Sequence, residues 1–212
     1  KLESTFSEFN TVFHNELDLT RTLRSHIAED VALWVEKLIE GNISSANELS
    51  IKTREQGFEL YITRDLDQAK SYAMGRYEGQ NEKRFGLIAS SKSNILPAFG
   101  IDNDFMTTRR FRGGPWFNDP PNSVKSCCAF NSVATEFQCQ GLELDLPIVC
   151  WDDDLLWDDG WKTKKTTRRS KVKDPHTLRL NSYRVLLSRG RDGIIIFVPP
   201  LEKLDSTHKV LV

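Results

Sequence analysis

The sequence lacks the phosphate-binding loop that a self-sufficient nucleotide hydrolase requires. No Gly-x-x-x-x-Gly-Lys-Ser/Thr pattern occurs among its 212 residues, and a loop of this kind cradles phosphates through its backbone N–H groups. The one glycine pair, Gly113-Gly114, is followed by Pro115-Trp116 rather than by the start of a helix. We therefore expect that this chain does not hydrolyse ATP by itself.

The sequence also has no segment that would take it to a membrane. It contains no signal peptide, no lipidation motif and no apolar run of about eighteen residues. We expect a cytoplasmic protein without a membrane partner.

Metal-binding and disulfide patterns are missing as well. The cysteines lack the regular spacing of a disulfide framework and the Cys-x-x-Cys spacing of zinc sites, and the histidines show no metal-ligand spacing. We expect reduced, partly buried thiols and no metal site. The residues concerned are Cys127, Cys128, Cys139, Cys150, His14, His26, His176 and His208.

The overall charge gives no general argument for nucleic-acid binding. The formal net charge is -1 and the isoelectric point is near 6.5, so any surface for a polyanion must be local.

Strands alternating with helices predict a parallel α/β sheet. Phe58–Ile62 reads as a strand, Asp65–Tyr77 as a helix, and Phe85–Ala89 as a strand covered on both faces. The length fits a single domain over 1–212, with an irregular insertion at about 100–131 and a charged loop at about 152–177. The other expected elements are a strand at Leu17–Leu23, a helix from Ser25 to Glu40, a strand at Leu146–Trp151, a helix around Leu178–Gly190 and a strand at Gly193–Val198.

Two phrases about fifty residues apart carry the strongest functional signal. Thr135–Asp145, which reads TEFQCQGLELD, places a glycine and a carboxylate on a turn before an apolar strand. Tyr183–Arg191, which reads YRVLLSRGR, places an arginine at the end of an apolar helix, before another apolar strand. The phrases resemble motifs V and VI of superfamily 1 helicases. More narrowly, most of the chain resembles the bacterial and viral helicase-like family related to the helicase domains of schlafen proteins.

The resemblance implies a RecA-like three-layer α/β sandwich of the P-loop NTPase class, here a C-terminal helicase domain without the Walker A loop. It also implies that Arg189 is an arginine finger, which stabilises the charge on a departing γ-phosphate. Gln140, Gly141 and Glu143 are the implied nucleotide contacts. An ordinary surface arginine at a helix end and an ordinary turn are the alternatives. The motif V histidine of these helicases is Phe137 here.

The segment Leu17–Ser25 is similar to motif IV of the same helicases, whose arginine also reaches the γ-phosphate. Arg24 matches that arginine, and Leu23 replaces the aromatic residue that often stacks on the base. The alternative is a cation at a helix start, paired with Glu29 or Asp30.

Three places are candidate contacts for single-stranded DNA or RNA. Thr135 begins the motif V phrase, and Ser90 and Lys92 follow a buried strand, where hydroxyls and ammonium groups can meet phosphates; capping of the next segment is the alternative. Arg110 and Trp116 lie in a stretch that mixes cations with aromatic rings, as single-strand binders do; a solvated loop with its rings folded onto the core is the alternative.

Asp152-Asp153-Asp154 follows an apolar strand, as the Mg²⁺-holding carboxylate of a Walker B site does. Without a phosphate loop, the sequence does not favour that interpretation. The basic run Lys162–Lys173 is expected to be an exposed hairpin or loop.

These observations favour the C-terminal motor domain of an ATP-dependent helicase or translocase. ATP with Mg²⁺ would be bound mainly by a P-loop domain of the same protein, N-terminal to Lys1. A non-catalytic nucleic-acid-binding module with a RecA-like fold and a purely regulatory or protein-interaction domain are the alternatives.

Overall fold

The structure is a computed structural model that describes residues 26–92, 94–103, 105–164 and 174–212. Arg24 and the strand predicted at Leu17–Leu23 lie outside the described residues. Among the described helices, none is long and apolar enough to cross a membrane.

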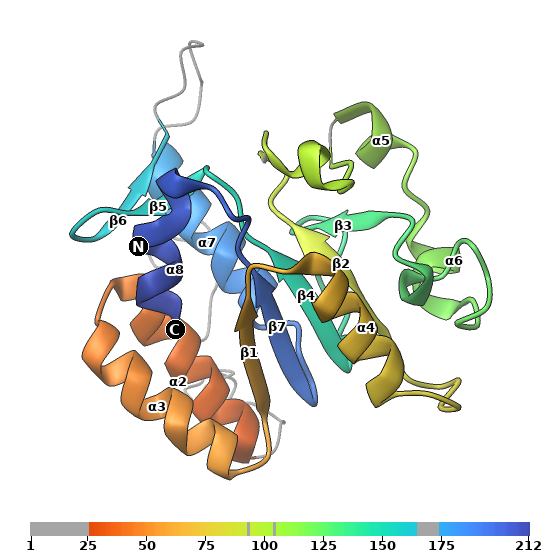
Figure 1. Cartoon of the computed structure of the whole chain (residues 1–212), viewed down its shortest axis with the longest axis horizontal. Coiled ribbons are helices and arrows are strands. Elements are labelled where there is room, and N and C mark those ends of the chain that lie inside the picture. The colour runs from red at the N-terminus through yellow and green to blue at the C-terminus, as the bar shows by residue number, and fades with distance from the viewer. Residues whose placement is uncertain (1–25, 93, 104, 165–173) are drawn as a thin grey trace, which may run out of the picture.

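A five-stranded, fully parallel sheet forms the centre of the fold (Figure 1). The strand order is β1-β7-β4-β2-β3. Every residue of β2, β3, β4 and β7 is buried, as expected for a parallel sheet covered on both faces. The strands are β1 (Glu59–Thr63), β2 (Phe85–Ala89), β3 (Val133–Thr135), β4 (Leu146–Cys150) and β7 (Gly193–Phe197).

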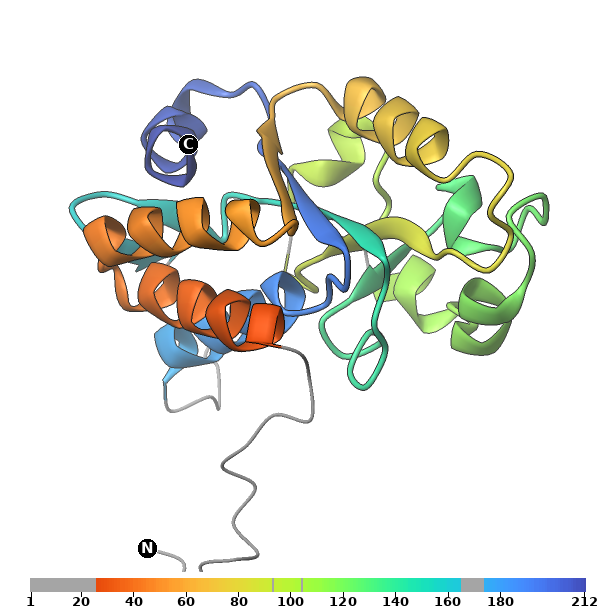
Figure 2. The ribbon, with the colours of Figure 1, turned by 90° about the horizontal axis from the view of Figure 1, so that it is seen from below.

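Helices cover both faces of the sheet. Helix α4 (Leu66–Arg76) lies on one face and α7 (Pro175–Leu187) on the other (Figure 2), as right-handed crossovers in opposite directions along the sheet require. Helix α2 (His26–Glu40) packs against α7 and against α3 (Ile43–Glu55). Helix α8 (Asp205–Leu211) closes the described chain.

Side-chain caps set where these helices begin. Asp65 accepts a hydrogen bond from the backbone N–H of Gln68, and Asp174 accepts one from that of Thr177. Asn42 caps α3 in the same way through Ser45 N–H. Each cap satisfies a backbone donor that the helix itself leaves unpaired.

The segment predicted as an irregular insertion contains only short elements within its described residues. These are the helices α5 (Phe105–Arg109) and α6 (Gly113–Asn118) and the 3₁₀ turn η3 (Cys127–Ala129), and the 3₁₀ turn η2 (Leu96–Phe99) comes just before the segment. They lie beyond β2 and β3 at one side of the sheet (Figure 1).

The predicted charged loop also contains regular structure. Strands β5 (Leu155–Trp157) and β6 (Trp161–Thr163) form an antiparallel hairpin, and α7 already begins at Pro175. Asp152, Asp153 and Asp154 precede the hairpin and are buried.

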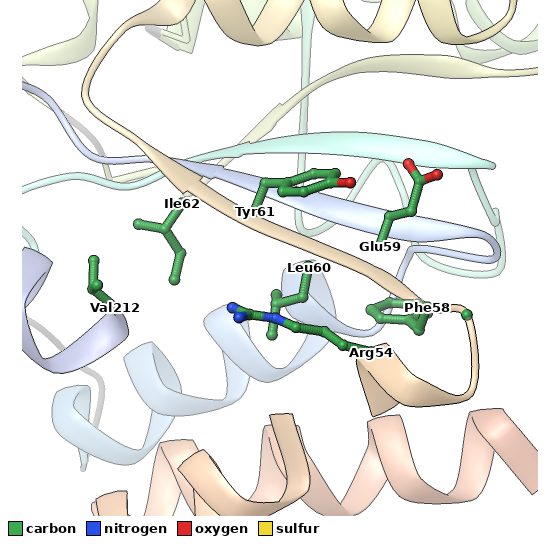
Figure 3. A pocket seen from close by; sticks show the side chains of 8 residues that line it. Arg54, Phe58, Glu59, Leu60, Tyr61, Ile62 and Val212 are labelled. Atoms are coloured by element: carbon green, nitrogen blue, oxygen red, sulfur yellow. The ribbon is translucent and has the colours of Figure 1, made fainter. Parts of the chain in front are cut away.

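The opposite border of the sheet is the exposed edge of β1, which has β7 as its one neighbour among the described strands. A cavity of about 540 Å³ lies along this edge, between α3 and the end of α8. In Figure 3, Glu59 and Tyr61 point to one side of β1, while Phe58, Leu60 and Ile62 point to the other. The residues lining this cavity include none of the predicted site residues.

Candidate functional site

The two diagnostic phrases meet at the amino ends of β4 and β7. The backbone N–H of Leu144 donates to the carbonyl of Arg189 over 2.9 Å, and the N–H of Arg191 donates to the carbonyl of Leu144 over 2.8 Å. This parallel bridge between Leu144 and Gly190 makes the phrases one structural unit. Gly190 permits the tight turn that leads into β7, because a Cβ there would lie 2.1 Å from the carbonyl oxygen of Gly193.

The side chain of Arg189 lies across the turn of the first phrase. Its Nη1 donates to the carbonyl of Leu142 over 3.2 Å and reaches that of Cys139 at 3.5 Å. Its Nε donates to the carbonyl of Val185 over 2.9 Å and its Nη2 to Ser188 Oγ over 2.9 Å. The guanidinium is therefore half-buried in a fixed position beside Gly141.

The turn itself is open to solvent. Gly141 has a φ of 79°, and no heavy atom lies within 4 Å of the place where its Cβ would be. Gln140 is exposed, and Glu143 is half-buried with its carboxylate 3.7 Å from Nε of Arg191. A bare backbone with a carboxylate and a guanidinium beside it can contact a phosphate and a sugar hydroxyl. Phe137, on the same loop, is 63% exposed.

A network of charged residues holds the amino ends of β4 and β7 together. The buried carboxylate of Asp145 accepts from the backbone N–H of Arg84 over 2.7 Å and from Lys83 over 3.2 Å. Lys83 also pairs with Asp192 over 2.6 Å, and this hydrogen bond is the main reason that the pKa of Lys83 is raised. Because a cation joins two carboxylates that precede β4 and β7, the amino ends of these strands are held together.

The predicted nucleic-acid residues Ser90 and Thr135 lie at the opposite, carboxyl edge of the sheet, and both are buried. Ser90 Oγ donates to Asp154 and accepts from Arg179 Nη1, both over 2.5 Å. Thr135 donates its Oγ1 and its backbone N–H to Gln138 Oε1. Of the three predicted residues here, Lys92 alone is exposed.

A buried ionic cluster, which the sequence did not predict, occupies this carboxyl edge. Arg179 lies 3.0 Å from Asp154 and 3.7 Å from Glu136, and all three residues are buried. Tyr183 donates to Asp154 over 2.7 Å. Burial raises the pKa of Asp154, while Arg179 acts to lower it. One feature of the sequence could have indicated this cluster. The spacing in α7 places Arg179 on the same helix face as the buried Ser182, Tyr183 and Leu186.

The three consecutive aspartates do not form a metal centre. Asp153 pairs with Lys203 over 2.5 Å and with Lys164 over 3.0 Å, and burial raises the pKa of Asp152. Within the described ranges, no group of three His, Cys, Asp or Glu side chains could hold a metal ion. The four cysteines are free, and all of them are buried, where the sequence predicted partly buried thiols.

The two candidate residues of the insertion have different surroundings. Arg110 is exposed. Trp116 is 1% exposed and packs on Phe111, with ring centroids 5.4 Å apart. This ring belongs to the core, so it presents no face on which a base could stack.

The predicted site residues therefore fall into three groups. Gln140, Gly141, Glu143 and Arg189 gather at the amino edge, Ser90, Lys92 and Thr135 lie at the carboxyl edge, and Arg110 and Trp116 lie in the insertion. The first group is the one that the fold assembles from two separate phrases.

Comparison with known proteins gives one family. Residues 1–200 match the family described as Schlafen group 3, DNA/RNA helicase domain. Neither the curated proteins nor the solved structures contain a significant match.

Proposed function

We propose, because the chain belongs to the Schlafen group 3 DNA/RNA helicase domain family, that it is the second RecA-like domain of an ATP-dependent helicase or translocase. In this role it supplies an arginine finger to ATP held on an N-terminal P-loop domain of the same protein. ATP hydrolysis would drive movement along single-stranded DNA or RNA, or remodelling of the nucleic acid.

One observation carries the proposal: two phrases about fifty residues apart form a single surface at the amino edge of the sheet. Arg189 Nη1 lies 3.2 Å from the carbonyl of Leu142, within the turn that contains Gly141. A finger must be held rigidly where charge develops, and four hydrogen bonds hold this guanidinium. The five-stranded parallel sheet with helices on both faces supports the RecA-like assignment.

The described residues at this edge suit a nucleotide but not its metal. Gly141 allows close approach of phosphate oxygens to its backbone N–H, and Glu143 can accept from ribose hydroxyls. The amino edge holds no carboxylate cluster suited to Mg²⁺ among the described residues, so we assign Mg²⁺ to the P-loop domain. Arg24, which lies outside the described residues, is proposed as a second γ-phosphate contact because its segment resembles motif IV.

Nucleic-acid-stimulated ATP turnover by the full-length protein tests this proposal. Arg189→Ala should lower kcat by about 10³–10⁵-fold, the typical contribution of an arginine finger. Arg189→Lys should stay close to that loss, because lysine keeps the charge without the planar fork. Arg184→Ala is the matched control, since Arg184 is exposed on the same helix and bonds to Asn181. Equal turnover in wild type and Arg189→Ala, both folded by circular dichroism, would refute the proposal.

A non-catalytic nucleic-acid-binding module is the second candidate. The observation that favours it is the cationic insertion, where Arg109, Arg110 and Arg112 follow one another closely. A protein with an intact P-loop domain that binds single strands tightly but never hydrolyses ATP would establish the module.

A further inference from the structure

The insertion encloses a cationic pocket at the β3 side of the sheet. The cavity has a volume of about 350 Å³, and Arg110, Arg112 and Lys125 line it together with Phe111 and Val124. No acidic side chain occurs among its described lining residues. The chain as a whole has a net charge of -1, so this pocket is a local concentration of positive charge of the kind that a polyanion requires.

Two hydrogen bonds and a ring contact hold residues that line the pocket. The buried Trp116 forms its floor, and Phe111 leans on that ring with centroids 5.4 Å apart. The backbone N–H of Trp116 donates to the carbonyl of Arg112 over 3.1 Å. Asn131 and Val124 also line the cavity, and Asn131 Nδ2 donates to the carbonyl of Val124 over 3.1 Å. These bonds hold the backbone of two of the segments that line the cavity.

A hydrogen bond joins the insertion to the turn that the Arg189 side chain contacts. Gln138 Nε2 donates to the carbonyl of Thr108, in α5, over 2.8 Å. The carbonyl of the next residue, Cys139, lies 3.5 Å from Arg189 Nη1. One side chain therefore joins the cationic insertion to the proposed ATP-facing edge.

We propose that this pocket binds one or two nucleotides of a single-stranded nucleic acid. Arg110, Arg112 and Lys125 meet the backbone phosphates, and the half-buried ring of Phe111 stacks on a base over the floor made by Trp116. Cations beside an aromatic face suit a nucleic acid better than a run of acidic residues, because each nucleotide pairs a phosphate with a base that can stack. The inference rests on the proposed nucleic-acid function and assigns that function a strand-binding surface.

Fluorescence anisotropy with labelled twelve-nucleotide oligo-dT and oligo-rU tests the pocket in the full-length protein without ATP. The double variant Arg110→Glu/Arg112→Glu should bind at least about tenfold more weakly, and the slope of log K against log salt should become less negative by about 1.4, as the loss of two phosphate contacts requires. Phe111→Leu should weaken binding roughly five- to hundredfold with the slope unchanged. The two oligonucleotides decide between DNA and RNA.

The matched control is Arg54→Glu/Lys209→Glu, which reverses two exposed cations on α3 and α8, away from the insertion. It should leave binding within about twofold, because α3 and α8 lie on the other side of the sheet from the insertion and screening by salt weakens interactions between distant exposed charges. Equal losses in the control and in the pocket variant would overturn the inference, since the effect would then follow net charge alone.

Photocrosslinking locates the contact independently of affinity. An oligonucleotide carrying 4-thiouracil should crosslink within residues 107–133, and Phe111→Leu should remove that adduct. A strand that binds wild type but crosslinks elsewhere, or poly-glutamate that competes as well as the oligonucleotide, would overturn the pocket. Arg189→Ala should still bind and crosslink, so failure of the pocket and failure of the arginine finger give different results.

Discussion

Replacement of Arg179 by methionine should destabilise the fold strongly. Arg179 is 7% exposed and lies 3.0 Å from Asp154 and 3.7 Å from Glu136. Methionine fills a similar volume but leaves two buried carboxylates without their cation. Breaking a buried ion pair in this way costs about 3–5 kcal/mol. A domain is typically stable by about 5–15 kcal/mol, so the variant should lose a large part of its stability.

The loss should depend on pH in a defined direction. Burial raises the pKa of Asp154, and Arg179 opposes that rise. Without Arg179 the pKa rises further, so the carboxyl binds a proton at a higher pH in the folded variant. The loss in free energy of unfolding relative to wild type is therefore fully present at high pH and becomes smaller as the pH falls through the new pKa of Asp154. Arg179→Met/Asp154→Asn should recover part of the stability at neutral pH.

Urea unfolding followed by tryptophan fluorescence measures the effect, and the five tryptophans give the signal. In thermal unfolding, the melting temperature of Arg179→Met should fall by about 6–20 °C for a domain of this size. A loss below about 1 kcal/mol at pH 7 with an unchanged urea dependence would refute the reasoning, because the buried carboxylates would then not need the guanidinium.

Three further predictions follow from the strands and turns. Gly193→Ala should destabilise the protein or prevent folding, because its Cβ would lie 2.4 Å from a carbonyl oxygen of β1. Gly75→Ala, on an open helix surface, should instead stabilise the protein by about 0.5–1 kcal/mol. Thermal unfolding of the two variants measures whether the melting temperature falls in the first and rises in the second. Gly141→Ala should cost about 1–2 kcal/mol through its φ of 79° alone, since nothing contacts the new Cβ, and unfolding equal to wild type would contradict this. Burial acts to raise the pKa of Asp153, but hydrogen bonds from its neighbours lower it to about 2, so its stabilising contribution is present above about pH 4 and is lost as the pH falls towards 2. Lys203→Met should weaken that acid dependence in unfolding curves between pH 2 and 6, and unchanged curves would exclude the pair as a source of stability.

The sequence predicted the elements whose patterns are strong. The predicted strand at Phe85–Ala89 has the bounds of β2, because a continuous apolar run ends in polar residues on both sides. The first described helix ends at Glu40, as predicted from the Gly41-Asn42 that follows. Helix α3 was missed, because Ile43–Glu55 buries only Ala46 and Thr53 and so lacks a clear apolar face.

Only part of the candidate site could be predicted from the sequence, because some of its residues are adjacent in the chain and others are far apart. A phrase such as Gln140–Glu143 carries its information in adjacent residues, so the sequence could identify it. The ionic cluster instead joins Ser90 to Arg179 across 89 positions, and no local spacing encodes such a pair. Residue type also does not tell whether a side chain is buried. Trp116 follows several arginines and was therefore predicted to bind nucleic acid, but its side chain is buried in the core.

The binding of a transition-state analogue tests the central claim most directly. The full-length protein is loaded with ADP and aluminium fluoride, and the affinity is compared with that for a non-hydrolysable ATP analogue in wild type and Arg189→Ala. An arginine finger acts on charge that develops only in the transition state, so the variant should lose affinity for the aluminium fluoride complex by about 10³-fold or more while its affinity for the ATP analogue changes little. Equal binding of the aluminium fluoride complex by both proteins would contradict the assignment of Arg189 to the nucleotide.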